Sequence, residues 1–138
     1  MATPRPQISE TEMEVLKVLW DEGPGTVRTL NERLRSKRRR WAYTTVQTLL
    51  NRLKEKGYVA RDESSMAHVF RASVTRDRFL SWRLREIADQ VCGGQASPLV
   101  TSLVRQKGLS EEEIGSLRNL LDEIEGTERD KKRGGRKR

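Results

Sequence analysis

The segment Tyr43–Val59 (YTTVQTLLNRLKEKGYV) decides the fold, because it has the pattern of a helix with two contrasting sides. Four of its apolar residues recur at helical spacing and form one stripe: Val46, Leu49, Leu50 and Leu53. The opposite side carries hydrogen-bonding residues that are mostly uncharged, and Gly57 suits the left-handed position that ends a helix. We therefore predict a helix from about Tyr43 to Lys56 that buries one side and leaves a polar side open.

Two further helices are predicted before this segment. Ser9 stands three residues before Glu12, which is the spacing of a capping box, and Thr26 can cap a second helix after a Gly-Pro-Gly sequence. The predicted bounds of the two helices are Glu10–Asp21 and Val27–Arg35. Five of the six residues from 35 to 40 are Lys or Arg, so we predict an exposed loop over residues 35–41.

Two short runs with the pattern of β-strands follow, Tyr58–Glu63 and His68–Val74. In the second run Phe70, Ala72 and Val74 alternate with polar residues, which favours a strand with one buried side. Three helices followed by a hairpin is the order of elements in a winged helix. We therefore predict a mainly α-helical fold with a small β-hairpin wing, in which a winged helix-turn-helix domain over residues 1–75 precedes a helical region.

The helical region, residues 76–125, is predicted to be a dimerisation domain. Helices over residues 76–91 and 97–106 are separated by two glycines, and Ser110 with Glu113 forms a second capping box before a final helix. Short helices with this much apolar surface cannot bury it alone, so we expect a second copy of the chain to cover it. The residues expected at this homodimer contact are Leu80, Leu84, Ile87, Val91, Leu99, Leu103, Ile114, Leu117, Leu120 and Leu121.

The net charge of +8 is concentrated at the two ends of the chain. Residues 1–75 hold 14 Lys and Arg against 9 Asp and Glu, residues 76–125 hold 7 against 9, and residues 126–138 hold 7 against 2. A polyanion such as double-stranded DNA is the natural partner of both basic blocks, whereas the slightly acidic middle block suits a protein contact. The last block contains no apolar residue and is predicted to be a disordered basic tail.

The polar side of the helix over residues 43–56 is the predicted DNA-reading surface. A major groove admits an α-helix, and the side chains of Thr, Gln and Asn can donate and accept hydrogen bonds at base edges. The residues expected to read bases are Thr44, Thr45, Gln47, Thr48 and Asn51. A second set is expected to bind phosphates without reading the sequence: Lys37, Arg38, Arg39, Arg40, Tyr43, Arg52, Arg61 and Arg71.

The residue content argues against catalysis and metal binding. His68 is the sole histidine and Cys92 the sole cysteine, so no catalytic triad, internal disulfide or cysteine-rich metal site can be built. We therefore expect no enzyme activity, no cofactor and no metal. The sequence has no run of about 18 apolar residues and no signal-peptide pattern, so we expect a cytoplasmic protein without a membrane contact.

Three motifs carry a family resemblance over nearly the whole chain before the tail. They are ISETEMEVL at residues 8–16 with Leu19-Trp20, YTTVQTLLNRL at residues 43–53 running into KGYV at residues 56–59, and LSEEEI at residues 109–114 with Leu117. In these motifs the chain resembles the penicillinase and methicillin-resistance repressors (BlaI and MecI), which are grouped with the copper-responsive CopY repressors.

The resemblance implies a homodimer that binds a palindromic operator and represses transcription. In this family a membrane-bound sensor protease cleaves an Asn-Phe bond in the dimerisation region, and Ser102-Leu103 stand at that position here. The resemblance thus suggests a sensor protease as a partner, but Ser102-Leu103 do not match the bond that such a protease cleaves. The paired cysteines with which the copper-responsive members bind metal are absent, since Cys92 stands alone.

Two other classes of function stay open on the residues alone. A sequence-independent architectural or RNA-binding protein would rely on the basic loop and tail, and competition between random duplex and one genomic site separates it from a specific repressor. A protein-interaction adaptor would use the winged helix to bind another protein. Failure to retain any duplex DNA at low salt would favour the adaptor.

Overall fold

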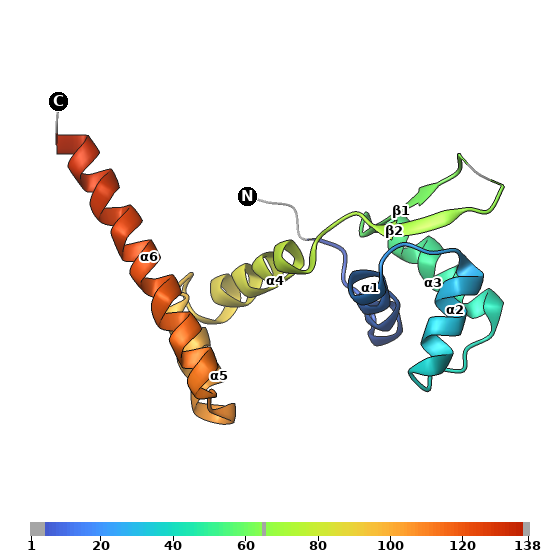
Figure 1. Cartoon of the computed structure of the whole chain (residues 1–138), viewed down its shortest axis with the longest axis horizontal. Coiled ribbons are helices and arrows are strands. Elements are labelled where there is room, and N and C mark those ends of the chain that lie inside the picture. Colours follow the sequence, from blue (N-terminus) through green and yellow to red (C-terminus); the bar gives the residue numbers. More distant parts are fainter. Residues whose placement is uncertain (1–4, 65, 137–138) are drawn as a thin grey trace. The chain divides into compact units, whose positions relative to one another are not determined.

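The computed structural model describes residues 5–64 and 66–136, and over this part of the chain it has the predicted order of helices and hairpin (Figure 1). The elements are α1 (Glu10–Glu22), α2 (Val27–Ser36), α3 (Tyr43–Glu55), β1 (Val59–Asp62), β2 (Val69–Ala72), α4 (Arg76–Val91), α5 (Ser97–Lys107) and α6 (Glu111–Arg136). The mainly α-helical fold with a β-hairpin wing is therefore confirmed. The chain forms two compact units, residues 1–83 and residues 84–138.

The ends of α1 and α2 are fixed by the caps that their sequences predict. Ser9 Oγ accepts a hydrogen bond from the Glu12 backbone N–H at 3.2 Å, and the Glu12 carboxylate accepts one from the Ser9 backbone N–H at 3.2 Å. Thr26 Oγ1 accepts a hydrogen bond from the Thr29 backbone N–H at 3.2 Å. Each bond satisfies a donor that the first turn of a helix leaves without a partner.

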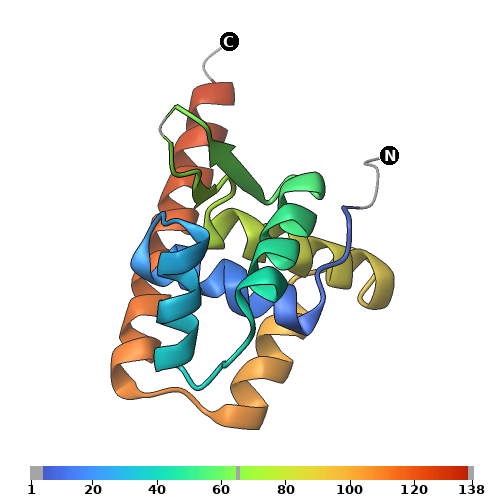
Figure 2. The same cartoon turned by 90° about the vertical axis from the view of Figure 1, so that its right-hand side faces the viewer.

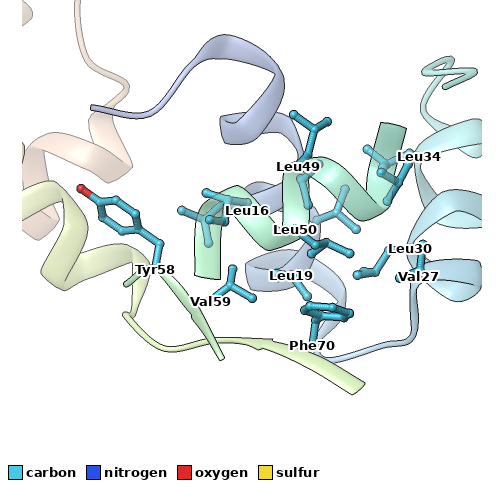
Figure 3. Packing of buried hydrophobic residues seen from close by; sticks show 14 of the residues in the cluster. Leu16, Leu19, Val27, Leu30, Leu34, Leu49, Leu50, Tyr58, Val59 and Phe70 are labelled. Carbon is cyan, nitrogen blue, oxygen red and sulfur yellow. The ribbon is translucent and has the colours of Figure 1, made fainter. Parts of the chain in front are cut away.

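The core of the N-terminal unit is made by α1, α2, α3 and the hairpin. Figure 3 shows apolar side chains from all of these elements pointing toward one another. The predicted stripe of α3 is buried, and Leu16, Leu30, Leu50 and Leu53 have no exposed surface at all. This packing orients α3, because burying one of its sides leaves the opposite, polar side outward.

The hairpin of β1 and β2 is antiparallel, with Arg61 opposite Phe70. Phe70 is buried, and its backbone exchanges two hydrogen bonds with Gly25, of 2.8 and 3.0 Å, in the loop between α1 and α2. Both views place the hairpin above the three helices (Figures 1 and 2). The hairpin is thus anchored to the helical core at its β2 strand, and its turn extends from there.

The first half of α4 belongs to the N-terminal unit, unlike the predicted boundary after residue 75. Phe79 is buried, with its ring centroid 5.5 Å from that of Trp20 and 5.9 Å from that of Tyr58. Trp20 Nε1 donates a 2.9 Å hydrogen bond to the Val74 carbonyl. These contacts tie the start of α4 to α1 and to the hairpin.

The tail also differs from the prediction, because α6 continues to Arg136. Our expectation of disorder is therefore wrong for residues 126–136, and residues 137–138 lie outside the described part. The sequence from Glu125 to Lys132 has no proline and sets Glu125 and Glu128 four residues before Arg129 and Lys132. This order of charges stabilises a helix, so a segment without apolar residues can extend α6. No helix in the described residues is long and apolar enough to cross a membrane.

Candidate nucleic-acid interface

The predicted base-reading residues lie on one side of α3. Thr44, Thr45, Gln47 and Thr48 are exposed and Asn51 is half-buried, whereas the four leucine and valine residues of the stripe are buried. The exposed group occupies the N-terminal half of the helix, which is the half nearest the bases in helix-turn-helix proteins. All five side chains are uncharged hydrogen-bonding groups, so this surface can select by bond pattern and not by charge alone.

The first turn of α3 has no side-chain cap. Its N-cap residue is Ala42, which makes no side-chain hydrogen bond to the helix. A helix N-terminus in this state is a favourable place for a phosphate oxygen, because its N–H groups and the helix dipole both attract negative charge. Within the helix, Thr48 Oγ1 donates a 2.9 Å hydrogen bond to the Thr44 carbonyl. Thr48 therefore has an acceptor and a methyl group left to offer to a base.

A groove runs between α2, α3 and the hairpin, and it contains residues of both predicted sets. Gln47, Asn51 and Tyr43 line it from α3, and Arg61 lines it from β1. Its other lining residues are Thr26, Val27, Arg28, Met66, Ala67, His68 and Phe70. Arg28 is a cation in the same groove as residues of α3, and the sequence prediction missed it. No local pattern marks it, because the groove is formed by elements that are distant in the sequence.

The basic loop before α3 divides into paired and unpaired cations. Lys37 Nζ lies 3.6 Å from Asp21 Oδ2, and Arg39 Nη2 lies 3.7 Å from Glu14 Oε1. In the described part of the chain Arg38 and Arg40 have no ion pair, and both are exposed. Carboxylates of α1 thus hold Lys37 and Arg39, whereas Arg38 and Arg40, which alternate with them, are free to meet a phosphate.

The hairpin cations also differ from each other. Arg61 forms an ion pair with Glu63, and this hydrogen bond holds the pKa of the Glu63 carboxyl below its ordinary value. Arg71 on β2 is exposed, as is Arg52 on the outer side of α3. Neither has an ion pair within residues 5–64 and 66–136. Of the three, Arg61 would have to leave a carboxylate in order to meet a phosphate.

A buried ion pair fixes the C-terminal end of α3. Lys56 Nζ lies 2.7 Å from Glu12 Oε1 and also donates a 2.7 Å hydrogen bond to the Gln7 carbonyl. Burial raises the pKa of Glu12, but the hydrogen bonds from Lys56 and Ser9 outweigh it, so this pKa lies below its ordinary value. Glu12 and Lys56 therefore join α1 and the segment before it to the end of α3.

Apolar residues are exposed along the helices of the C-terminal unit. Of the predicted dimerisation set, only Leu99 is half-buried and the others are exposed. Val100 and Ile124 are two further exposed residues of the same kind, at 52% and 50%. Large apolar side chains are thus exposed on α4, α5 and α6, and exposed apolar surface of this kind is typical of protein contacts.

The described residues contain no group of three His, Cys, Asp or Glu side chains that could hold a metal ion. Cys92 is a free, half-buried cysteine at the end of α4.

Comparison with known proteins identifies the family. The penicillinase repressor family model matches residues 8–123. The penicillinase repressor of Bacillus licheniformis is 28% identical over 118 residues, which cover 86% of this chain and 91% of that protein. The methicillin resistance regulatory protein MecI of Mammaliicoccus sciuri is 27% identical over 116 residues, which cover 84% of this chain and 94% of that protein.

Among solved structures, the DNA binding domain of the repressor BlaI matches with a TM-score of 0.47 and 30% identity, covering 56% of this chain and 93% of that chain. The match to the family model extends over both units, from the segment before α1 into α6. The chain therefore belongs to the penicillinase repressor family, a family of transcriptional repressors and not of enzymes.

Proposed function

We propose that this chain represses transcription by binding a palindromic operator as a homodimer, with α3 of each protomer in a major groove. The observation that carries the proposal is the exposed cluster of uncharged donors and acceptors on the N-terminal half of α3, Thr44, Thr45 and Gln47 among them. An ordinary solvated helix surface favours Lys, Glu and Arg instead. The relatives named above are repressors, which supports the same role for this chain.

α3, the cations beside it and the hairpin would each contact the duplex. α3, which we call the reading helix, would select the DNA sequence, while Arg38, Arg40 and Arg52 would bind phosphates on either side of the groove. The hairpin would carry Arg71 toward the neighbouring backbone, as the wing. Phosphate contacts supply most of the affinity and base contacts the choice of site, so both groups are needed.

The exposed apolar residues of α4, α5 and α6 support the proposed homodimer. A second copy would bury them, and its two-fold symmetry would match the symmetry of a palindromic operator. Two reading helices then contact two half-sites, which raises affinity for the paired site without any new kind of contact.

The experiment is selection of bound fragments from the source genome, followed by competition of the selected site against random duplex. A specific repressor recovers one recurrent, two-fold symmetric sequence and prefers it over random duplex by a factor of about 1,000 or more. Recovery of unrelated fragments that bind with equal affinity would contradict the proposal and favour a sequence-independent DNA-binding protein.

A further inference from the structure

The last part of α6 is a basic surface that the family match does not include. The match ends at residue 123, whereas α6 continues to Arg136. Its exposed cations in this part, which we call the basic extension, are Arg129, Lys131, Lys132 and Arg133. Within the described residues none of the four has an ion pair. These charges are therefore available to a partner.

The geometry of α6 sets three of the four cations of the basic extension apart from the apolar residues, whereas Lys131 falls on the apolar side of the helix. Arg129, Lys132 and Arg133 are spaced by three and four residues, so they share one side of the helix. With about 3.6 residues per turn, the centre of this side is rotated by roughly 100° from that of the apolar residues Leu117, Leu121 and Ile124. The last apolar residue of α6, Ile124, also comes before Arg129, the first cation of the extension. A second copy that covers the apolar side would leave these three cations exposed.

The chemistry of the extension fits the phosphates of duplex DNA. Residues 126–134 include no aromatic or aliphatic side chain. Such a segment lacks the aromatic side chains on which proteins that bind single strands stack unpaired bases, and it has no apolar side to insert into a lipid surface. Its cations suit a dense row of negative charges. Because the chain also carries a proposed DNA-binding unit, binding of that unit would tether the extension to the duplex.

We propose that the basic extension is a second, sequence-independent contact with the DNA duplex. It adds affinity for specific and random DNA alike and makes binding more sensitive to salt. This inference rests on the proposed function, because it requires that the chain binds DNA. It goes beyond that function in assigning a DNA contact to a segment outside the winged helix and outside the family match.

The test compares the full-length chain with the variant Lys132→Gln/Arg133→Gln, using a random duplex of about three helical turns as the probe. The matched control is Arg85→Gln/Arg105→Gln, which removes the same number of exposed cations from α4 and α5. Binding is measured between about 50 and 200 mM salt, and the slope of log affinity against log salt is compared. The slope of the extension variant should be shallower by about 2 per protomer, and the slope of the control should match that of the wild type.

Circular dichroism and solution mass should show that both variants keep their helix content and assembly state. Equal slopes for the wild type and the extension variant would overturn the inference and leave the proposed function intact. Failure of the wild type to bind any duplex would overturn both. The extension would be a membrane contact, and the inference wrong, if the variant lost binding to phosphatidylserine vesicles while keeping its affinity for the duplex.

Discussion

Gln47 is the side chain on which the reading role can be tested most directly. It is exposed on the N-terminal half of α3 and lines the groove beside Asn51. A glutamine can form two hydrogen bonds with one adenine, and a matched pair of this kind discriminates by about 1–3 kcal/mol against a wrong base. The residue thus has the length, the exposure and the chemistry that base reading requires.

We predict that Gln47→Ala weakens binding to the selected operator by about 1–3 kcal/mol and leaves binding to random duplex unchanged. The change should be confined to one base-pair position in each half-site when a panel of single-base operator variants is measured by fluorescence anisotropy. Lys17→Ala, at an exposed position of α1, is the control and should bind as the wild type does. An equal loss on specific and random duplex would contradict a reading role for Gln47.

Glu12 is a residue with a structural role that stability measurements can isolate. The residue is 2% exposed, and within the described residues its Oε2 has no hydrogen-bond partner, so the pairing with Lys56 must offset the cost of burial. The folded pKa of Glu12 lies below its ordinary value of 4.5. Its charged form therefore adds stability above that value, and this part is lost as the pH falls through the folded pKa.

We predict that Glu12→Gln lowers the free energy of unfolding by about 1–3 kcal/mol at neutral pH, because a hydrogen bond between charged groups is replaced by a weaker one. Below pH 4.5 the difference between variant and wild type should shrink, since the wild-type carboxyl becomes protonated. Urea denaturation at a series of pH values measures both effects. Glu10→Gln, exposed in the first turn of α1, is the control. A constant difference at all pH values would exclude ionisation of Glu12 as the cause.

The basic loop between α2 and α3 contains two kinds of cation, those in ion pairs and those without one. Arg39 is paired with Glu14 and Lys37 with two carboxylates at the end of α1, Asp21 and Glu22. The hydrogen bond from Arg76 to Asp21, together with Lys37, keeps the pKa of Asp21 below its ordinary value. The paired cations thus shape the loop, and the other two, Arg38 and Arg40, are better placed to anchor phosphates.

We predict that Arg38→Gln/Arg40→Gln reduces the slope of log affinity against log salt by about 2 per protomer on any duplex. Lys37→Gln/Arg39→Gln should change this slope less and the free energy of unfolding by no more than about 1 kcal/mol, since half-exposed ion pairs are weak. Binding titrations at several salt concentrations compare the two variants, which lose equal charge. The division of the loop would be wrong if the paired variant lost as much of the slope as the unpaired one.

Helices were predictable from the sequence because their signals are local. Ser9, Thr26 and Ser110 each mark a helix start within three residues, and the spacing of apolar residues gives the buried side. The partners of Phe79 were not predictable, since Trp20 and Tyr58 lie far from it in the sequence. Arg28 was missed for the same reason. The tail was judged by composition alone, although the order of its charges favours a helix.

At the scale of the whole molecule, the proposed function requires two chains. The exposed apolar residues of α6 include Leu120 and Leu121, at 50% and 59%. If these residues lie inside a homodimer, a carboxylate introduced among them would lose its hydration on association. Burying an unpaired carboxylate is costly, so such a substitution would oppose formation of the dimer. A chain that stays monomeric would keep its reading helix but could contact one half-site at a time.

We predict that Leu121→Glu converts the homodimer into monomers and weakens operator binding by a factor of about 100 or more, while a single half-site is bound as by the wild type. Asn119→Glu adds the same charge on the other side of α6 and should leave both the solution mass and the operator affinity unchanged. Analytical ultracentrifugation and binding to full and half operators provide the two measurements. The two binding measurements separate the effects, because the half-site affinity does not depend on the contact between copies, whereas the full-site affinity does. A monomeric wild type, or a Leu121→Glu variant that stays dimeric, would remove α6 from the dimer contact.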